Sequence, residues 1–562
     1  MKYILTLIPF AGLLISLNAQ LNMKASGLTQ ISYEAAYNGQ KQENQNPVWV
    51  LTDGANFLIS SRDALQNKPD YPFEMTLVNA QNKSYRQLGF LNPEQTIGLD
   101  DSTSVAKQEF EFLNETKTIL GYKCKKAKTV INSNTIEIWF TNEKDIYASP
   151  YVLGANLGLV LEVVRNGNFV LQATEIKKKA KLPAFVLASK PEMLEPTDYR
   201  DKLWRSRFTN LSVFNQQIIN FSESFEPKED VLRFANGTIA VKKVKFPKLT
   251  TSSQVFVDLT EQSNGDAYDR TGSVFLIPTG KKQSFLDGLE KGADSLPVYE
   301  NGNGKKYQGI AATKTYEPIV ELMRFFTPFG VKHFNDRLTL KNKSWQDSVY
   351  YRQEISDFAS LLSEKEVYIG VFIGNYDKGG HKISMNISIH EDEDLNHPLK
   401  KVVPLFNTLN VMEMAGQEYS TLFDSEKGLV VEFELEEDLK NTKLKYISTG
   451  HGGWENGDEF VQKKNTVLLD DKIVFDLIPW REDCGSYRLY NPVSGNFPNG
   501  LSSSDLSRSN WCPGTVTNPY LIDLGDLKAG KHKIQVLIPQ GAPEGSSFSA
   551  WNVSGVLIGD SF

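Results

Sequence analysis

Cysteine and histidine are scarce in this chain of 562 residues, which contains three cysteines and six histidines. No two cysteines have the spacing of a zinc site. The histidines form no His-His or His-x-His pair, and a copper monooxygenase would need such a cluster. We therefore expect no metal ion. One alternative stays open, in which His451 binds a metal together with Glu455 or Asp458.

The motifs of several enzyme classes are also missing. The sequence has no Walker pattern, no dinucleotide-binding fingerprint, no Gly-x-Ser-x-Gly elbow and no His-Glu-x-x-His. The net charge is −7 and there is no large basic field. Nucleic acid is therefore not expected as a partner.

Long apolar runs are absent after the N-terminus. Residues 1–19 have the pattern of a signal peptide, in which Lys2 is the positive start, 4–17 is the apolar stretch and Ala19 is the small residue at the cleavage point. The stretch is short for a membrane span, although an N-terminal anchor is the alternative. We expect a secreted or periplasmic protein with no membrane partner.

Helical patterning is sparse, and alternation of apolar and polar residues dominates. Residues 159–164, the pair Asn166-Gly167 and residues 169–176 predict a hairpin with a type I′ turn. One short helix is expected at 197–204, after Pro196. Many short strands with frequent turn signals favour an all-β fold of sandwiches or barrels.

The length of the chain fits roughly three domains. After the signal peptide, a β-rich unit is expected over residues 20–180 and a connector with a short helix over 181–223. A second β unit is expected over 224–390. The acidic stretch at 391–401 is predicted to be a solvated linker, and a third β unit completes the chain over 402–562.

Two acidic segments lie next to predicted strands. In Asp266–Arg270, a carboxylate beside an arginine at a strand end could activate water while the arginine holds a substrate. Asp458–Phe460 precedes the strand predicted at 466–469. Each signal is weak alone, because turn aspartates commonly cap backbone N–H groups and exposed turn carboxylates are ordinary.

A third segment, Arg508–Gly514, combines an arginine, a tryptophan and a cysteine. In an oxidising compartment Cys484 and Cys512 are the candidate disulfide, which leaves Cys124 unpaired; three free thiols are the alternative. A loop pinned in this way would display Trp511 for stacking on a sugar. The alternative is that Trp511 packs into its own domain.

Several short segments occur in a fixed order along residues 224–562. They are Lys245-Phe246-Pro247, Asp266 to Arg270, Phe326 to Phe329, Ile355 to Phe358 with Leu361-Leu362, Val402 to Pro404, Ile447-Ser448 with Gly450-His451, Glu459-Phe460, and Trp511 to Gly514. Their order, their spacing and the cysteine pair resemble the bacterial peptide:N-glycosidase F family, especially its longer members with an extra N-terminal domain.

The resemblance implies an amidase that cleaves the bond between an asparagine side chain and the first N-acetylglucosamine of an N-glycan. Asparagine becomes aspartate, and the glycan leaves as a glycosylamine. The implied fold is two adjacent eight-stranded antiparallel jelly-roll sandwiches with the active site in the cleft between them, and no metal or cofactor is used. The expected substrates are N-linked glycoproteins and glycopeptides, and a monomer is expected.

The resemblance also assigns the site. Asp269 falls on the family's principal catalytic aspartate and Glu459 on its second catalytic acid, and two carboxylates across a cleft can share the tasks of amide hydrolysis. Which acid takes which task stays open. Tyr268 and Phe460 stand where the family has tryptophans. The expected substrate contacts are Tyr268, Arg270, Trp454, Phe460, Arg508 and Trp511.

One feature of the family pattern is absent. The family has a third acid followed two residues later by a tryptophan, whereas the matching strand here reads Val371 to Asp377 without that pair. The role of this acid is lost, moved or misaligned. We expect a different pocket around the innermost N-acetylglucosamine and an altered tolerance of core fucose.

The N-terminal unit is a separate matter. Residues 119–127 resemble a class of small exported β-proteins of Bacteroidetes, which look like open, curved half-barrels. No catalysis is expected there; the unit is expected to bind glycoprotein or to support the cleft. For the whole chain, the main alternative to the amidase is a non-catalytic secreted β protein that binds carbohydrate or glycoprotein.

Overall fold

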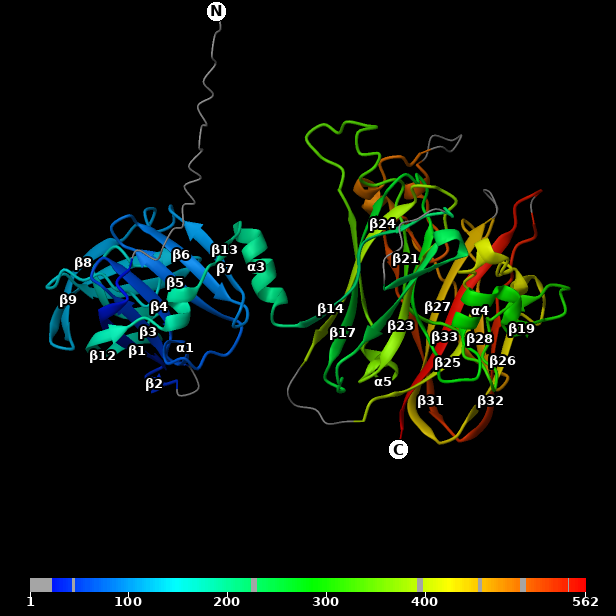
Figure 1. Ribbon diagram of the computed structural model, residues 1–562, viewed down its shortest axis with the longest axis horizontal. Helices are drawn as coiled ribbons and strands as arrows, with labels where there is room; N and C mark the ends of the chain where they lie inside the picture. Colours follow the sequence, from blue (N-terminus) through cyan, green and yellow to red (C-terminus); the bar gives the residue numbers. More distant parts are fainter. Residues whose placement is uncertain are drawn as a thin grey trace, which may run out of the picture. The chain divides into compact units, whose positions relative to one another are not determined.

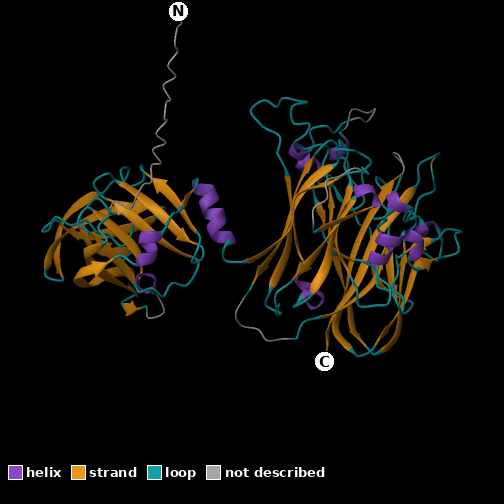
Figure 2. Cartoon of the chain, in the orientation of Figure 1, coloured by secondary structure: helices purple, strands orange, loops and turns teal. Residues whose placement is uncertain are grey.

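The computed structural model describes residues 23–42, 46–223, 230–391, 398–452, 457–495, 502–543 and 545–561. They divide into two compact units, residues 1–207 and 208–562. The predicted signal peptide at 1–19 lies outside the described residues. Among those that are described, no helix is long and apolar enough to span a membrane. Strands dominate both units and helices are few and short (Figure 2).

Unit 1, residues 1–207, is built on one large sheet, in which 13 strands are described. The strand order is β13-β7-β6-β5-β4-β3-β1-β12-β11-β10-β9-β8, with β2 paired to β1, and Figure 1 shows the sheet curved. Its strands are β1 (Ser26–Tyr37), β2 (Gln40–Lys41), β3 (Val48–Thr52), β4 (Asn56–Ser61), β5 (Phe73–Asn79), β6 (Ser84–Phe90), β7 (Thr96–Asp101), β8 (Glu111–Ile119), β9 (Tyr122–Ile131), β10 (Asn134–Thr141), β11 (Leu159–Arg165), β12 (Phe169–Lys181) and β13 (Glu192–Met193).

Local sequence explains several features of this unit. The hairpin β11–β12 turns at Asn166 and Gly167, which both have positive φ (52° and 73°), as a type I′ turn requires. Helix α3 (Pro196–Arg205) begins with its proline in the first turn and buries Tyr199 and Leu203, which lie on one helix face. The predicted hairpin and helix are thus confirmed. The other helices of the unit are α1 (Arg62–Leu65) and α2 (Ala184–Ala188).

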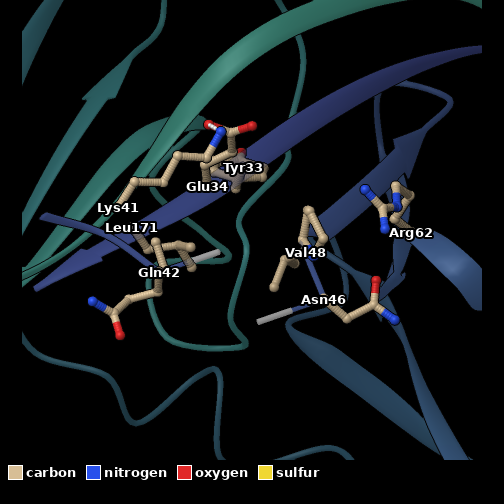
Figure 3. Close-up of a pocket in the computed structure, with 10 residues that line it drawn as sticks. Tyr33, Glu34, Lys41, Gln42, Asn46, Val48, Arg62 and Leu171 are labelled. Carbon is tan, nitrogen blue, oxygen red and sulfur yellow. Dashed lines mark ion pairs between the residues drawn. The ribbon is translucent and has the colours of Figure 1, made fainter. Parts of the chain in front are cut away.

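A hollow of about 300 Å³ opens on unit 1 beside β1 and β3 (Figure 3). Tyr33, Glu34, Lys41 and Arg62 line it, and the ammonium of Lys41 lies 2.8 Å from the carboxylate of Glu34. Among its described lining residues Glu34 is the one acid. The described residues therefore supply no pair of carboxylates for acid–base chemistry in this hollow.

Unit 2 begins with a sandwich of two sheets, in the orders β14-β24-β17-β22 and β15-β16-β23-β18-β21-β30. Val257, Val274, Val371 and Ile387 come from both sheets and share one buried core. The strands are β14 (Thr209–Ile219), β15 (Val231–Phe234), β16 (Ile239–Lys245), β17 (Gln254–Ser263), β18 (Thr271–Ile277), β21 (Val320–Phe326), β22 (Val349–Glu354), β23 (Glu366–Ile373), β24 (His381–His390) and β30 (Val516–Thr517).

The first of these strands lies where a connector was expected. Strand β14 falls within residues 181–223, yet Leu211 pairs with Ile387 of β24, and Val213, Phe214 and Ile219 are buried in the core. Leu211 and Val213 alternate with polar neighbours, as in a strand, before the polar run Asn215 to Gln217 interrupts the pattern. The sandwich therefore begins at about Thr209 and not after residue 223.

The second sandwich pairs the sheets β25-β33-β27-β31 and β26-β32-β28-β29. Leu444, Val467, Val536 and Trp551 belong to its core. Its strands are β25 (Lys401–Asn407), β26 (Leu429–Leu435), β27 (Leu439–Gly452), β28 (Asn465–Leu469), β29 (Lys472–Leu477), β31 (Tyr520–Leu527), β32 (Gly530–Leu537) and β33 (Ser549–Ser561). The remaining described elements of unit 2 include α4 (Phe285–Lys291), α5 (Ala359–Leu362), β19 (Val298–Tyr299) and β20 (Tyr307–Gln308).

The two sandwiches share side chains. Strand β33 is buried on both faces: Val556 and Ile558 belong to the first core, and Val553 and Leu557 to the second. Strand β30, from the second half of the chain, pairs with β21 of the first sandwich. The two cores are thus built from overlapping parts of the chain.

A buried ion pair also joins the sandwiches. Arg324 on β21 is fully buried, and its Nη2 donates to Glu321 (2.7 Å) while its Nη1 donates to the carbonyl of Asn552 on β33 (2.6 Å). The hydroxyl of Ser554 donates to Glu321 (2.8 Å). Because a buried charge is tolerated only when paired and hydrogen-bonded, this network fixes how the two sandwiches meet.

Candidate functional site

The loop between β17 and β18 carries Asp269 and is held in place by Asp266. The side chain of Asp266 accepts from the backbone N–H of Tyr268 (3.2 Å) and from Nε and Nη2 of Arg270 (2.6 and 3.1 Å). The N–H of Arg270 donates to Thr327 Oγ1 (2.8 Å), and the N–H of Thr327 donates back to the carbonyl of Arg270 (2.9 Å). These bonds fix the backbone on both sides of Asp269.

His381 on β24 and Glu261 on β17 lie behind Asp266. His381 Nδ1 is 2.8 Å from Glu261 Oε1, and its Nε2 is 3.3 Å from Asp266 Oδ2. No sequence pattern joins these residues, because 120 positions separate His381 from Glu261. We call Glu261, Asp266, Arg270 and His381 the support cluster.

The members of the support cluster pair with one another, and this pairing shifts their pKa values. Burial opposes ionisation of Asp266, but hydrogen bonds from His381 and Arg270 hold its pKa well below the usual range. Burial alone would lower the pKa of His381, whereas hydrogen bonds to Asp266 and Glu261 raise it to about 9. Burial raises the pKa of Glu261. At neutral pH His381 is therefore a cation between two acids.

Glu459 and Arg508 come from two loops of the second sandwich. The backbone of Arg508 pairs with that of Arg481 in both directions, with N–H to carbonyl distances of 2.9 and 3.0 Å. The N–H of Ser509 donates to the carbonyl of Glu459 (3.0 Å). The loop that carries Glu459 is thus tied by its backbone to the loop that carries Arg508.

The disulfide lies in the same region. Cys484 and Cys512 are bonded, and Cys124 is a buried free thiol in unit 1. The predicted pairing is confirmed. The bond joins the segment after Arg481 to the segment after Arg508, so it holds together the two chain segments whose backbones already pair.

Arg508 brings the two predicted catalytic acids together. Its Nη1 contacts Oε1 of Glu459 and lies 3.2 Å from Oδ2 of Asp269. Its Nη2 donates to the carbonyl of Ser503 (2.8 Å). The guanidinium is 1 % exposed, while the side chains of Glu459 and Asp269 keep 19 % and 15 % exposure. We call Asp269 and Glu459 the acid pair; Arg508 lies at the buried end of their site.

Both acids of the pair hold their protons more tightly than free carboxyls. Burial raises the pKa of Asp269 to about 6, against the opposing charges of Arg508 and Arg270. Burial also raises the pKa of Glu459 to about 7, and the nearby charge of Asp269 adds to this while Arg508 opposes it. The pair therefore titrates near neutral pH. In that range one carboxyl can hold a proton while the other is ionised.

Trp511 supports Arg508 from within the protein. The Arg508 guanidinium lies 4.3 Å from the Trp511 ring centroid, and Phe326 stacks on the same indole at 4.3 Å. The indole N–H donates to the carbonyl of Gly450 (3.0 Å), and the residue is 4 % exposed. The expectation of a displayed ring is wrong, and the alternative of a packed tryptophan describes the structure. The Arg508 guanidinium also lies 5.0 Å from the ring centroid of Phe460.

Exposed aromatic rings lie beside Arg270. Tyr268 is 60 % exposed and Tyr376 is 57 % exposed. The Arg270 guanidinium lies 5.1 Å from the first ring and 5.9 Å from the second. Of the predicted contact residues, Tyr268 thus offers a free ring face to a ligand. Trp454 lies outside the described residues.

A third carboxylate reaches this region from the second sandwich. Glu413, in the 3₁₀ turn Glu413–Ala415, has Oε1 3.1 Å from where a Cβ on Gly374 would lie. Burial raises its pKa, against hydrogen bonds from Tyr419 and Asn410 and the charge of Arg270. Glu413 was not predicted from the sequence, because the third acid of the family was expected on the strand that ends near Gly374. A glycine at that position could have indicated that a side chain from another part of the chain fills the space.

His451 and Asp458 have structural partners. Burial, followed by the charges of Arg324 and Arg508, lowers the pKa of His451 to about 3, and its Nε2 lies 2.7 Å from Thr449 Oγ1. Asp458 is fully buried and accepts from the indole N–H of Trp551 (2.7 Å). The third proposed ligand, Glu455, lies outside the described residues. Within the described ranges, no group of three His, Cys, Asp or Glu is placed to hold a metal ion.

Models of three protein families match the chain in sequence order. They are described as N-glycanase peptide, N-terminal domain (residues 31–201), peptide-N-glycosidase F, N terminal (residues 210–389), and peptide-N-glycosidase F, C terminal (residues 418–558). The three matches coincide with the curved sheet, the first sandwich and the second sandwich.

Solved structures are similar over nearly the whole chain. One structure of PNGF-II is 51 % identical, covers 95 % of this chain and 98 % of its own, and has a TM-score of 0.87. A second is 52 % identical, covers 95 % of this chain and 100 % of its own, and has a TM-score of 0.88. A peptide-N(4)-(N-acetyl-β-D-glucosaminyl)asparagine amidase is 15 % identical over 63 % of this chain and 96 % of its own, with a TM-score of 0.41. A search of curated proteins found no match.

Proposed function

Because the chain belongs to the peptide-N-glycosidase F family, in the form that carries an additional PNGase F-II N-terminal domain, we propose that it is a peptide-N⁴-(N-acetyl-β-glucosaminyl)asparagine amidase. It hydrolyses the asparagine side-chain amide that carries the innermost N-acetylglucosamine of an N-linked glycan. The observation that carries the proposal is the acid pair: two partly buried carboxyls with pKa values of about 6 and 7, joined by Arg508.

The acid pair can divide the tasks of amide hydrolysis, because both carboxyls titrate near neutral pH. We assign the general base to Asp269, which falls on the family's principal catalytic aspartate; it takes a proton from water as the water oxygen attacks the amide carbonyl carbon. We assign the general acid to Glu459, which gives its proton to the leaving nitrogen. The C–N bond breaks, aspartate remains on the peptide and the glycosylamine departs. Proton transfer from Asp269 to Glu459 restores the starting state.

Arg508 is assigned a role that acts through the acid pair. Its Nη1 and Nη2 contact the acid pair and Ser503, and its buried Nε–H has no hydrogen-bond partner among the described residues. The side chain is 1 % exposed, so its charge, and not a direct hydrogen bond, is what acts on the substrate. We assign Arg508 the roles of holding the two carboxyls together and of stabilising the negative charge that develops during attack.

The sugar side of the site is assigned to Tyr268 and Arg270. The ring of Tyr268 is exposed and lies against the guanidinium of Arg270, which Asp266 holds by two hydrogen bonds. An aromatic face suits the apolar face of a pyranose ring, and the phenol offers a hydrogen bond. Phe460 and Trp511 are assigned an indirect role, because their rings pack on Arg508 and hold its guanidinium in place.

The pocket for the innermost sugar is expected to differ from that of other family members. Gly374 carries no side chain there, and Glu413 reaches the same space from the second sandwich. We propose that this arrangement alters the tolerance of core fucose. Turnover of core-fucosylated and unmodified glycopeptides, compared with a standard family member, tests the idea. Equal profiles for the two enzymes would count against it.

The reaction class is tested on a denatured N-glycoprotein. The expected result is a shift in gel mobility, with each former glycosylation site converted from asparagine to aspartate by mass spectrometry. Asp269→Asn should abolish both changes. If Asp269→Asn and Glu459→Gln kept the protein's full function, a non-catalytic glycan-binding protein would be the better description.

Three further properties belong to the proposal. We infer that the protein is exported to the periplasm or the medium, because residues 1–19 have the pattern of a signal peptide and the protein contains a disulfide. We infer a monomer and a jelly-roll order of strands in each sandwich, by analogy with the family. Size-exclusion chromatography with light scattering tests the inference of a monomer.

A further inference from the structure

A groove of about 590 Å³ lies in unit 2, and Arg508 and the acid pair are not among the residues that line it. It is formed by β22, by the 3₁₀ segment Cys484–Tyr490 and by the segment from Asn510 to Tyr520. Asn510 lines the groove, whereas the side chain of Arg508, two residues earlier, contacts Asp269 and Glu459. The volume is in the range of about 300–1,000 Å³ that small-ligand sites occupy.

Tyrosine rings dominate the walls of this groove. Tyr350 projects from β22 and is 51 % exposed, and it is joined in the lining by Tyr487, Tyr490 and Tyr520. The Tyr520 hydroxyl lies 3.5 Å from Asn510 Oδ1, so a polar amide stands next to an aromatic ring. Rings that combine an apolar face with a hydroxyl suit ligands that are apolar on one side and polar at their edges, as pyranose sugars are.

The charges of the groove are neutralised within the protein. Arg352 Nη1 donates to Asp258 (2.8 Å), and Arg481 donates from Nε and Nη2 to the two oxygens of Asp483 (2.9 and 2.7 Å). The groove therefore offers guanidinium and hydroxyl groups without an excess of positive charge. A neutral ligand that is rich in hydroxyl groups fits better than a phosphate or an acidic peptide.

An extended peptide is the other ligand to weigh, because β22 is the edge strand of its sheet. Two bonds tie this part of the chain to its neighbours: the Tyr351 hydroxyl donates to the carbonyl of Phe326 on β21 (2.8 Å), and the N–H of Gln346, just before β22, donates to the carbonyl of Leu489 (3.1 Å). Neither bond uses the backbone of β22 itself. The aromatic side chains of the lining favour a saccharide, and binding of a peptide is one of the outcomes of the test.

We propose that this groove is a second carbohydrate site, which binds the neutral outer part of an N-linked glycan. The choice of N-glycan rests on the proposed function; the choice of a neutral saccharide rests on the lining residues. Such a site would hold one glycan of a multiply glycosylated protein while another is cleaved at the acid pair.

Binding of mannopentaose to the Asp269→Asn protein, followed by ligand-observed NMR and by titration calorimetry, tests the proposal. This probe has no N-acetylglucosamine and no amide, so it reports on the groove and not on cleavage. Binding is expected, and Tyr350→Ala should weaken it by about fivefold or more. Tyr350→Phe keeps the ring and should stay within about twofold of the parent protein. Tyr487→Ala should reproduce the loss if Tyr350→Ala does not fold.

Tyr37→Ala is the matched control, because Tyr37 is 46 % exposed and lies in unit 1. It should leave mannopentaose binding unchanged. Tyr350→Ala should also leave kcat/KM unchanged on a short glycopeptide whose glycan is trimmed to its two innermost sugars. No binding by the parent protein, equal binding by Tyr350→Ala, or displacement of the sugar by an unglycosylated peptide would each overturn the proposal.

The outcomes separate the two proposals. An enzyme that cleaves glycopeptides but does not bind mannopentaose keeps the amidase and loses the second site. A protein that binds mannopentaose through Tyr350 but converts no asparagine to aspartate keeps the second site and loses the amidase.

Discussion

Asp266 and Asp269 stand three positions apart in one loop, and their environments shift their pKa values in opposite directions. Asp266 is 2 % exposed and accepts from Arg270, from the N–H of Tyr268 and from His381, so its pKa lies well below the usual range. Asp269 is also largely buried, yet its Oδ2 has an ion-pair contact with Arg508 and no aligned hydrogen bond among the described residues, and its pKa is about 6.

Burial alone therefore does not decide the charge of a carboxyl group in this site. The number and alignment of the donors that face it decide the outcome. In the support cluster, the hydrogen-bond donors around Asp266 keep that carboxyl ionised. In the acid pair, the carboxyls have fewer aligned donors and can exchange a proton near neutral pH. The following experiments change one side of this contrast at a time.

Asp269→Asn should have the largest effect on activity. Loss of a general base lowers turnover by about 10²–10⁴-fold, and the neutral amide removes a carboxyl whose ionisation the folded state opposes. The free energy of unfolding at pH 7 should therefore not fall. Glycopeptide turnover and urea unfolding measure the two quantities. Asp266→Asn is the matched control: it should lower the free energy of unfolding, because Arg270 and His381 lose their partner.

Arg508→Met should have the next largest effect. It leaves two partly buried acids without their shared cation, and breaking such a pair costs about 3–5 kcal/mol. The loss should be largest above pH 7, where both acids would be ionised, and smaller at pH 5. Urea unfolding at the two pH values measures it. A loss that is the same at both would show that packing against Trp511, and not charge, accounts for the contribution of Arg508.

His381→Gln tests the support cluster. The pKa of His381 is raised to about 9 in the folded protein from 6.5, so its stabilising effect is complete below pH 6.5 and is lost as pH rises through 9. The full effect is on the order of 3 kcal/mol. The difference in unfolding free energy between parent and variant should therefore shrink from pH 6.5 to pH 9. His532→Gln is the comparison. His532 Nδ1 lies 2.8 Å from Oδ2 of Asp470, whose side chain is 46 % exposed, so this variant should show a smaller change in unfolding free energy.

The pH dependence of kcat/KM should report the acid pair. The rate should rise through pH of about 6 and fall above about 7, and the two apparent values belong to the pair as a unit. The residual activity of Glu459→Gln should lose the alkaline limb, because the acid that must be protonated is gone. Retention of that limb in the variant would assign the general acid to another group.

The parts of the site that lie in short sequence segments could be predicted from the sequence. Asp269, Glu459 and the disulfide lie in short segments whose residue types and order can be compared directly, and the structure brings the two acids together through Arg508. The support cluster could not be foreseen, because Glu261 and His381 meet across paired strands, and alternation predicts a strand without naming its neighbour.

Trp511 and Glu413 show a second limit. A tryptophan in a loop suits both a sugar platform and a packed ring, and only the position of Phe326 decides between them. The acid near Gly374 was sought along one strand, whereas Glu413 fills the same space from another sandwich. Likewise, the alternation in β14 is limited to its first residues, and the strand lay in a stretch whose most evident feature was a helix.

The overlap of the two sandwich cores has a consequence for the order in which the chain can fold. The first core contains Val556 and Ile558, and its sheet is completed by β30 at Val516–Thr517, so the first sandwich cannot be completed before residue 558 has been added. Unit 1 ends at residue 207 and has no such wait. During synthesis and export the chain would thus expose an apolar, unfinished sandwich, which holding chaperones would have to cover until its last strands are available.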